Sequence, residues 1–208
     1  MELYKQFIKR LFDILFSFIG LIVFIPLFVV VAILIKLESL GPVFFIQKRI
    51  GKNFKPFDLY KFRSMVMGAT KMGPPITMGN DTRITKTGGF LRKAKIDELP
   101  QLFNVLKGEM SFVGPRPELL QYVEKFQKDY EEILMIKPGI TDLASLKYRD
   151  EASILGGTKE PEKEYVCRIL PEKIRLAKEY LKRSSLILDL SIIFKTLIKL
   201  VINKTNRH

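Results

Sequence analysis

An uncharged apolar run near the N-terminus constrains this chain more than any other feature. Residues 14–35 contain no charged side chain, and Ser17 is the only polar one. A helix of about 22 residues reaches roughly 33 Å, which is enough to cross the hydrocarbon core of a bilayer. The run is too long for a signal peptide, and no small-residue cleavage site follows it. We therefore expect residues 1–40 to form a membrane anchor and residues 41–208 to form a cytosolic or interfacial domain.

Two features of the run argue against a simple crossing of the bilayer. Basic residues flank it on both sides, whereas Lys and Arg normally gather on the cytoplasmic side alone. Pro26 lies in its middle, where it removes a backbone donor and clashes with the preceding turn. Each half of about 12 residues would reach roughly 18 Å, too short to span alone. The run thus predicts either a re-entrant helix-break-helix or a kinked spanning helix, and the residues alone do not decide between them.

Charge and residue counts narrow the chemistry of the rest of the chain. The 208 residues carry a net charge of +13, which favours an anionic partner such as nucleic acid, a phosphorylated small molecule or an anionic membrane face. Cys167 is the single cysteine, so no internal disulfide or multi-cysteine metal site can form. His208 is the single histidine and the last residue, which argues against histidine-dependent triads and zinc sites. Catalysis would have to use carboxylates, lysines, arginines or tyrosines.

The part after the apolar run has the pattern of a small, mainly helical α+β domain. Residues 43–50 and 54–65 are rich in aromatic and β-branched side chains and flank Gly51-Lys52-Asn53, which predicts a β-hairpin. On such a strand Lys61 and Arg63 share one face, because side chains alternate. Residues 66–82 contain several glycines and prolines and predict a long loop, of the kind that is often functional.

Further helices are expected in the second half of the chain. Residues 118–135 keep apolar side chains at spacings of three and four, and Pro138-Gly139 ends the pattern. Residues 171–203 are also helical in pattern, with long apolar stretches interrupted by lysines. Such basic, apolar helices could lie in the membrane interface or could pack into the core of the domain, and the pattern leaves both open.

Candidate chemistry is concentrated between residues 95 and 118. Asp97 and Glu98 are adjacent, and Pro100 follows them, which predicts a short helix over residues 98–107 ended by Gly108. In the commoner interpretation Asp97 only caps this helix. In the functional interpretation the helix N-terminus keeps Asp97 ionised and attracts phosphate, so that Asp97 can attack phosphorus while Glu98 holds a divalent metal.

The sequence Gly114-Pro115-Arg116-Pro117 is the second candidate feature. Two prolines fix the backbone on either side of one arginine. An arginine held in this way is suited to bidentate binding of a phosphate group. Taken alone, the same residues would also fit a rigid turn with an exposed arginine.

Ordered stretches along most of the chain resemble the bacterial sugar transferase family, the small monotopic phosphoglycosyl transferases. Pro26 within the apolar run is part of this resemblance. The matching stretches are KRLFDILFS at 9–17, GPVFFIQKRIG at 41–51, FDLYKFRSM at 57–65, DTRITKTGGFLRKAKIDELPQLFNVLKGEMSFVGPRPE at 81–118 and KPGIT at 137–141.

The resemblance implies transfer of a phosphosugar from a UDP-sugar to a polyprenol phosphate such as undecaprenyl phosphate, with release of UMP. This would be the first membrane step of glycoconjugate or polysaccharide assembly. It further implies a monotopic protein at the cytoplasmic face of the bacterial inner membrane, embedded among membrane lipids by a re-entrant helix that breaks at Pro26. Magnesium, Mg²⁺, is the implied cofactor.

The resemblance also assigns roles to residues of this chain. Asp97 matches the nucleophile that forms a covalent phosphosugar intermediate, and Glu98 matches its partner, with both at the metal. Arg116 is expected at a substrate phosphate. A re-entrant anchor would bring three further phosphate-binding residues to the same depth as Asp97, namely Lys61, Arg63 and Arg83.

Some points stay open in the sequence. Many members of the family read PGITGWAQV where this chain has PGITDLASL at 138–146, so the choice of sugar is not determined. The non-enzymatic alternative is a membrane-anchored basic module that binds anionic lipids, and it gives Asp97, Glu98 and Arg116 no role. A phosphatase using an aspartyl phosphate would show Asp-x-Asp after a buried strand, and the sequence has none. Nucleic acid is not expected as a partner, and a homo-oligomeric state is left open.

Overall fold

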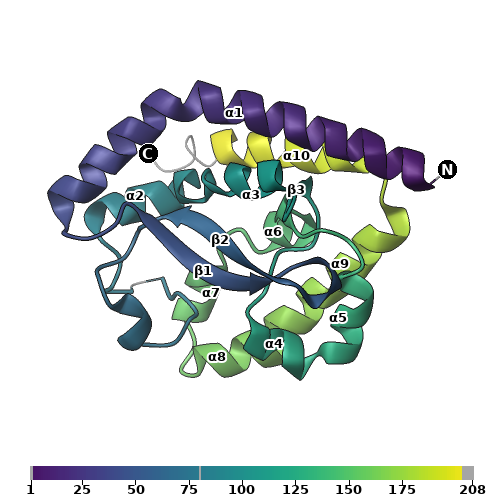
Figure 1. Ribbon diagram of the computed structural model, residues 1–208. Coiled ribbons are helices and arrows are strands. Elements are labelled where there is room, and N and C mark those ends of the chain that lie inside the picture. The colour runs from purple at the N-terminus through teal and green to yellow at the C-terminus, as the bar shows by residue number, and fades with distance from the viewer. Residues whose placement is uncertain (1, 80, 203–208) are drawn as a thin grey trace.

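The computed structural model describes residues 2–79 and 81–202, so His208 lies outside the described residues. Within these ranges most elements are helices, and two pairs of short strands complete the fold (Figure 1). In chain order the elements are α1 Glu2–Glu38, β1 Phe44–Ile50, β2 Pro56–Phe62, α2 Lys86–Lys93, α3 Gln101–Lys107, β3 Ser111–Val113, α4 Leu120–Lys125, α5 Gln127–Ile133, β4 Gly139–Thr141, α6 Leu143–Lys147, α7 Glu151–Gly156, α8 Pro161–Glu164, α9 Leu170–Arg183 and α10 Leu186–Ile202.

The apolar N-terminal run forms the long helix α1, which passes through Pro26 without interruption. The expected break at Pro26 is therefore wrong as secondary structure, and Figure 1 shows instead an arch with a bend in its middle part. A proline removes only one donor, so a helix held on both sides of it can bend and continue. Gly20 lies against Leu102 of α3, and beyond the proline Val31 and Ile35 are buried in a cluster with other parts of the domain.

The outward face of α1 is apolar and exposed. The stretch Phe7–Glu38 is long and apolar enough to cross a membrane, judged by length and composition. Only 11% of its most apolar window is buried, whereas the core helix of a soluble protein would be mostly covered. This arrangement is compatible with a monotopic membrane protein, and the re-entrant path stays a prediction.

The predicted hairpin is confirmed. β1 and β2 pair in antiparallel orientation, with Phe44 opposite Phe62 and Ile50 opposite Pro56. Between them Gly51 N donates to the carbonyl of Lys55 at 2.9 Å and closes the turn. The predicted loop over residues 66–82 is also confirmed for its described residues, 66–79 and 81–82, apart from a short 3-10 turn at Ala69–Lys71.

A parallel pair of short strands follows α3. Ser111 of β3 lies opposite Gly139 of β4, and Val113 lies opposite Thr141. Gly114 and Gly139 approach so closely that a Cβ on Gly139 would overlap the backbone of Gly114. Glycine at these two positions thus allows the chain after β3 to run directly against β4.

The helix expected over residues 118–135 is divided, which corrects the prediction. α4 and α5 are separated at Phe126, whose backbone angles (φ −127°, ψ 37°) are not helical. The Phe126 side chain packs against the main core cluster, which is built around Tyr122, Tyr130 and Leu170. The apolar spacing continues across the break, and the pattern therefore could not reveal it.

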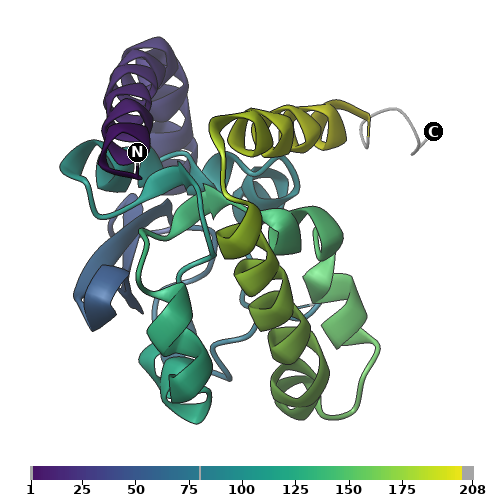
Figure 2. The same ribbon diagram turned by 90° about the vertical axis from the view of Figure 1, so that its right-hand side faces the viewer.

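The C-terminal third contains one core helix and one exposed apolar helix. α9 buries Leu170, Ile174 and Tyr180 in the domain and so takes the core alternative. α10 instead exposes most of its large apolar side chains, including Ile187 at 82% and Phe194 at 64%. Figures 1 and 2 both place α10 at the same end of the molecule as α1.

A candidate active site beneath the apolar helix

Asp97 lies in a single 3-10 turn, Ile96–Glu98, rather than at the start of a helix. Lys95 enters this turn with a left-handed backbone (φ 57°), and α3 begins only at Gln101, with Pro100 in its N-cap position. The helix ends at Gly108 (φ 89°), as predicted. The interpretation of Asp97 as the cap of this helix is therefore wrong, since Pro100 occupies the N-cap position of α3 and Asp97 lies three residues before it.

One oxygen of the Asp97 carboxylate is buried without a hydrogen-bond partner. The residue is 7% exposed, and among the described residues nothing hydrogen-bonds to its buried Oδ1 atom. Burial, followed by the charge of Glu98, raises the pKa of Asp97 above its ordinary value, while the nearby cations Lys61, Lys95 and Arg92 oppose this rise. A buried acceptor without a donor is costly, so such a group calls for an explanation in function.

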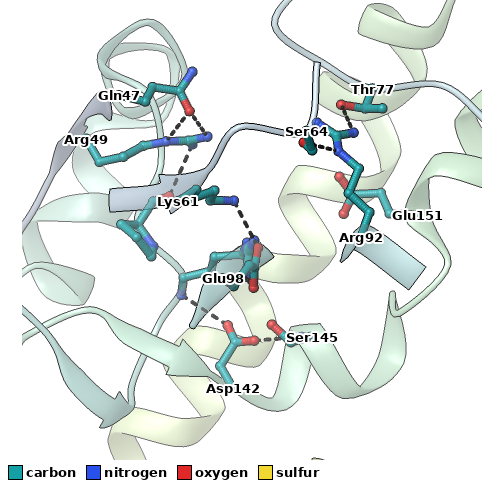
Figure 3. A network of polar contacts seen from close by, with 12 residues as sticks. Gln47, Arg49, Lys61, Ser64, Thr77, Arg92, Glu98, Asp142, Ser145 and Glu151 are labelled. Carbon is teal, nitrogen blue, oxygen red and sulfur yellow. Dashed lines mark hydrogen bonds and ion pairs between the residues drawn. The ribbon is translucent and has the colours of Figure 1, made fainter. Parts of the chain in front are cut away.

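Glu98 has the opposite surroundings. Lys61 Nζ lies 2.9 Å from Glu98 Oε1, and the Arg116 guanidinium contacts both oxygens of the same carboxylate. Burial disfavours the charge on Glu98, but Arg116 and Lys61 outweigh it and hold the pKa of Glu98 well below its ordinary value. Figure 3 shows Lys61 directed at Glu98 from the end of β2. The structure thus brings four of the predicted site residues together.

Arg63 and Arg83 make other contacts. Arg63 follows β2, and its guanidinium donates to the carbonyls of Leu40 and Ser39 at the end of α1. Arg83 pairs with Asp81 at 2.6 Å and donates to three carbonyls of the loop over residues 66–82. Most of their donors are therefore engaged within the chain, and their role in binding phosphate stays a prediction.

Two arginines that sequence reasoning did not single out lie near the carboxylate pair. Arg92 of α2 donates to the hydroxyls of Ser64 and Thr77 at 2.7 and 3.0 Å, and its charge influences the pKa of Asp97 (Figure 3). Arg49 of β1 donates to the Pro117 carbonyl at 3.2 Å. The available signal for Arg49 was its place on the inward-facing side of β1, where a charged residue is unusual.

The donor set fits a divalent cation of the magnesium type. No group of three or more potential ligand side chains occurs in the described part of the chain. Mg²⁺, however, commonly uses only one or two protein carboxylates and completes its shell with water and substrate phosphate. The unpartnered Oδ1 of Asp97 can serve as such a ligand, and Glu98 is the adjacent carboxylate.

Comparison with known proteins gives consistent results. The sequence model of the family described as "Bacterial sugar transferase" matches residues 4–203. An Aeromonas hydrophila protein named UDP-N-acetylgalactosamine-undecaprenyl-phosphate N-acetylgalactosaminephosphotransferase is 40% identical over 92% of this chain and 43% of its own length. A Klebsiella pneumoniae protein named UDP-glucose:undecaprenyl-phosphate glucose-1-phosphate transferase is 40% identical over 95% of this chain and 41% of its own length.

A third relative is similar in length to this chain. The exopolysaccharide production protein PSS of Rhizobium leguminosarum bv. phaseoli is 39% identical over 92% of this chain and 94% of its own length. The chain thus spans less than half of the first two relatives, at 43% and 41%, and nearly all of the third.

Proposed function

Because the chain belongs to the bacterial sugar transferase family, we propose that it transfers a phosphosugar from a UDP-sugar to a polyprenol phosphate and releases UMP. The Aeromonas and Klebsiella relatives are named for transfer to undecaprenyl phosphate, from UDP-N-acetylgalactosamine and from UDP-glucose respectively. The observation that carries the proposal is the buried Asp97 carboxylate, which has an unpartnered oxygen beside a Glu98 held by two cations. A non-catalytic lipid-binding module has no use for such a pair.

In the proposed first step an Asp97 oxygen attacks the phosphorus that carries the sugar. The bond from this phosphorus to the bridging oxygen of the diphosphate breaks, and UMP leaves with the electron pair. In the second step a phosphate oxygen of the polyprenol phosphate attacks the same phosphorus and the bond to Asp97 breaks, which restores the carboxylate. Splitting the transfer in this way lets one site handle two large substrates in turn.

The surroundings of Asp97 support its use as a nucleophile. Its raised pKa makes the carboxylate more basic than an exposed one, while three neighbouring cations limit the rise. Glu98 forms ion pairs with Arg116 and Lys61 and so keeps these two cations close to Asp97. We propose that these two cations turn to the donor diphosphate when it binds, since both are suited to phosphate oxygens.

We further propose that Asp97 and Glu98 hold Mg²⁺ in the presence of substrate. Bound there, the ion would neutralise charge on the phosphate oxygens. The turn Ile96–Glu98, which leads into α3, would hold the two carboxylates in place relative to one another.

The lipid substrate places a further demand on the site, which must lie at the depth of the phospholipid headgroups. The turn that carries Asp97 leads into α3, and α3 packs against the apolar helix α1. We propose that α1 is re-entrant, that α10 lies in the interface beside it, and that the site faces the cytoplasm. The exposed apolar faces of both helices support this placement.

Asp97→Asn tests the proposal. The amide is nearly isosteric but cannot attack phosphorus, so UMP release from UDP-glucose, UDP-galactose or UDP-N-acetylgalactosamine with undecaprenyl phosphate should fall at least about 10³-fold. Flotation with phospholipid vesicles should show unchanged membrane binding. Asp58→Asn, the same change in the solvent-facing part of the hairpin, serves as the matched control and should keep activity. Full activity of Asp97→Asn would refute the mechanism.

A further inference from the structure

The segment that carries Arg116 is held by hydrogen bonds at successive residues. Three of these bonds join backbone groups, and the fourth comes from the side chain of Arg49 in β1. They are Gly114 N to Thr141 O (3.2 Å), Gly139 N to Pro115 O (3.0 Å), Arg49 Nη1 to Pro117 O (3.2 Å) and Ile50 N to Glu118 O (3.0 Å). None of these four bonds acts on Arg116 itself.

The bond at Arg116 comes from Asp142. Asp142 Oδ2 accepts from the backbone N–H of Arg116 at 3.1 Å. Its second oxygen, Oδ1, accepts from Ser145 N at 2.6 Å and caps helix α6, as Figure 3 shows for the labelled pair. Asp142 is 4% exposed, so neither bond competes strongly with water. One carboxylate thus joins the start of a helix to the backbone of the site arginine.

The segment is not closely packed on the side that faces Asp142. A small cavity of about 20 Å³ lies beside it, lined among others by Pro115, Arg116, Glu118 and Asp142. Such a space is close to the room one water molecule needs. On this side of the segment the Asp142 carboxylate, which lines the cavity, supplies the hydrogen bond to the Arg116 backbone N–H.

We propose that Asp142 is a positioning residue, which sets the place of the Arg116 guanidinium relative to Glu98 and to the donor diphosphate. The inference rests on the proposed function. Position 142 falls in the stretch where the chain departs from the family pattern, which has glycine there. Misplacing a catalytic or binding group by about 1 Å can cost roughly 100-fold in rate, so a single backbone contact can matter.

Asp142→Ser and Asp142→Asn test the proposal in the full chain. Both residues are good helix caps, so α6 keeps its bond from Ser145. Neither offers a second carboxylate oxygen to Arg116 N–H. We expect kcat/KM for the most active of UDP-glucose, UDP-galactose and UDP-N-acetylgalactosamine to fall about 10- to 100-fold. Asp150→Asn makes the same chemical change at the N-cap position of α7 and should leave kcat/KM unchanged.

A double-mutant cycle separates positioning from stability. Arg116→Ala removes the guanidinium but keeps the backbone N–H that Asp142 binds. Asp142→Ser should therefore lower the melting temperature equally in both backgrounds, yet lower kcat/KM only where Arg116 is present. An equal loss of kcat/KM in both backgrounds would overturn the proposal.

Hydrogen exchange supplies a readout that needs no activity. Arg116 lies between two prolines, so few amides contribute to a peptide spanning residues 113–119. Asp142→Ser should speed exchange in this peptide, and unchanged exchange would overturn the proposed contact. A wild-type protein without transferase activity would refute the proposed function, and the exchange experiment would still decide whether Asp142 holds Arg116.

Discussion

Asp97 and Glu98 are neighbours in the chain, yet their surroundings shift their pKa values in opposite directions. Burial and the adjacent charge of Glu98 raise the pKa of Asp97. The pKa of Glu98 is lowered, because the charges of Arg116 and Lys61 outweigh the effect of its burial. Carboxylates separated in this way commonly take different roles in a reaction. Here Glu98 pairs with Lys61 and Arg116, and the buried Oδ1 of Asp97 has no hydrogen-bond partner among the described residues.

The raised pKa of Asp97 predicts that Asp97→Asn stabilises the fold at neutral pH. The pKa of Asp97 is higher in the folded protein than in the unfolded chain. Its carboxyl group therefore contributes fully to the free energy of unfolding at a pH below the unfolded-state pKa. This contribution is lost as the pH rises through the folded-state pKa. A tenfold difference in proton affinity between the folded and unfolded states corresponds to about 1.4 kcal/mol of stability. We expect Asp97→Asn to melt at a higher temperature than wild type at about pH 7.5, with the difference shrinking towards about pH 4.

Thermal unfolding of detergent-solubilised protein at several pH values checks this prediction. Asp58→Asn removes one negative charge from the hairpin surface and controls for the change in net charge. A melting temperature of Asp97→Asn at or below that of wild type at neutral pH would contradict it.

Lys61 should tune the pH dependence of the reaction. Its charge lowers the pKa of Asp97, so Lys61→Gln should raise that pKa further. The acid limb of kcat/KM against pH should then move to higher pH, because the proposed mechanism requires Asp97 to be ionised when it attacks. Lys107→Gln, which removes an exposed lysine bonded to Tyr60, is the control and should not move the limb. A limb that moves to lower pH in Lys61→Gln would show that Asp97 does not control it.

Sequence reasoning at this scale found residues whose spacing is local. Asp97, Glu98 and Arg116 lie in one ordered stretch, and their contact with Lys61 is present in the structure. The sequence could not show that Arg63 and Arg83 donate hydrogen bonds to backbone carbonyls. It also could not show that Arg49 and Asp142 bind the segment around Arg116. Those contacts depend on tertiary folding between distant elements.

At the scale of elements, the hairpin and the helical character of residues 171–203 follow from their patterns, whereas the core position of α9 and the breaks in the chain do not. Pro26 bends α1 but does not break it, and Phe126 separates α4 from α5 within an unbroken apolar pattern. In both cases packing against neighbouring elements decides the outcome. The strands β3 and β4, at three residues each, are too short to show any alternation.

The bend at Pro26 should control the path of α1 in the membrane. With proline present we expect both termini on the cytoplasmic side, and in Pro26→Leu we expect a straighter helix that moves the N-terminus across. Cysteine placed at residue 2, in a background with Cys167→Ser, can be labelled by an impermeant reagent in sealed inverted vesicles. Wild-type α1 should give labelling, and Pro26→Leu should give protection.

A cysteine at residue 184, in the connection to α10, marks the cytoplasmic side and should be labelled in both proteins. Protection at residue 2 in the presence of Pro26 would mean a plain spanning helix. The mechanism at Asp97 would survive that result, but the re-entrant anchor would not.

On the scale of the whole molecule, two apolar helices lie at one end, and the turn that carries Asp97 and Glu98 lies beneath α1. Lys9 of α1 pairs with Asp189 of α10 at 2.6 Å and also contacts Tyr180, so the two helices are fixed relative to one another. α3 connects α1 to the turn that carries Asp97. The sequence predicted the anchor, but this arrangement follows from long-range packing that no local pattern contains.

Mass spectrometry of the protein after incubation with donor alone tests the central claim most directly. The full chain is mixed with UDP-glucose, UDP-galactose or UDP-N-acetylgalactosamine, denatured, digested and searched for modified peptides. We predict a sugar-phosphate adduct on Asp97 that disappears when undecaprenyl phosphate is added, and that never forms in Asp97→Asn. UMP release that requires both substrates together, with no adduct on Asp97 at any time, would contradict the covalent mechanism.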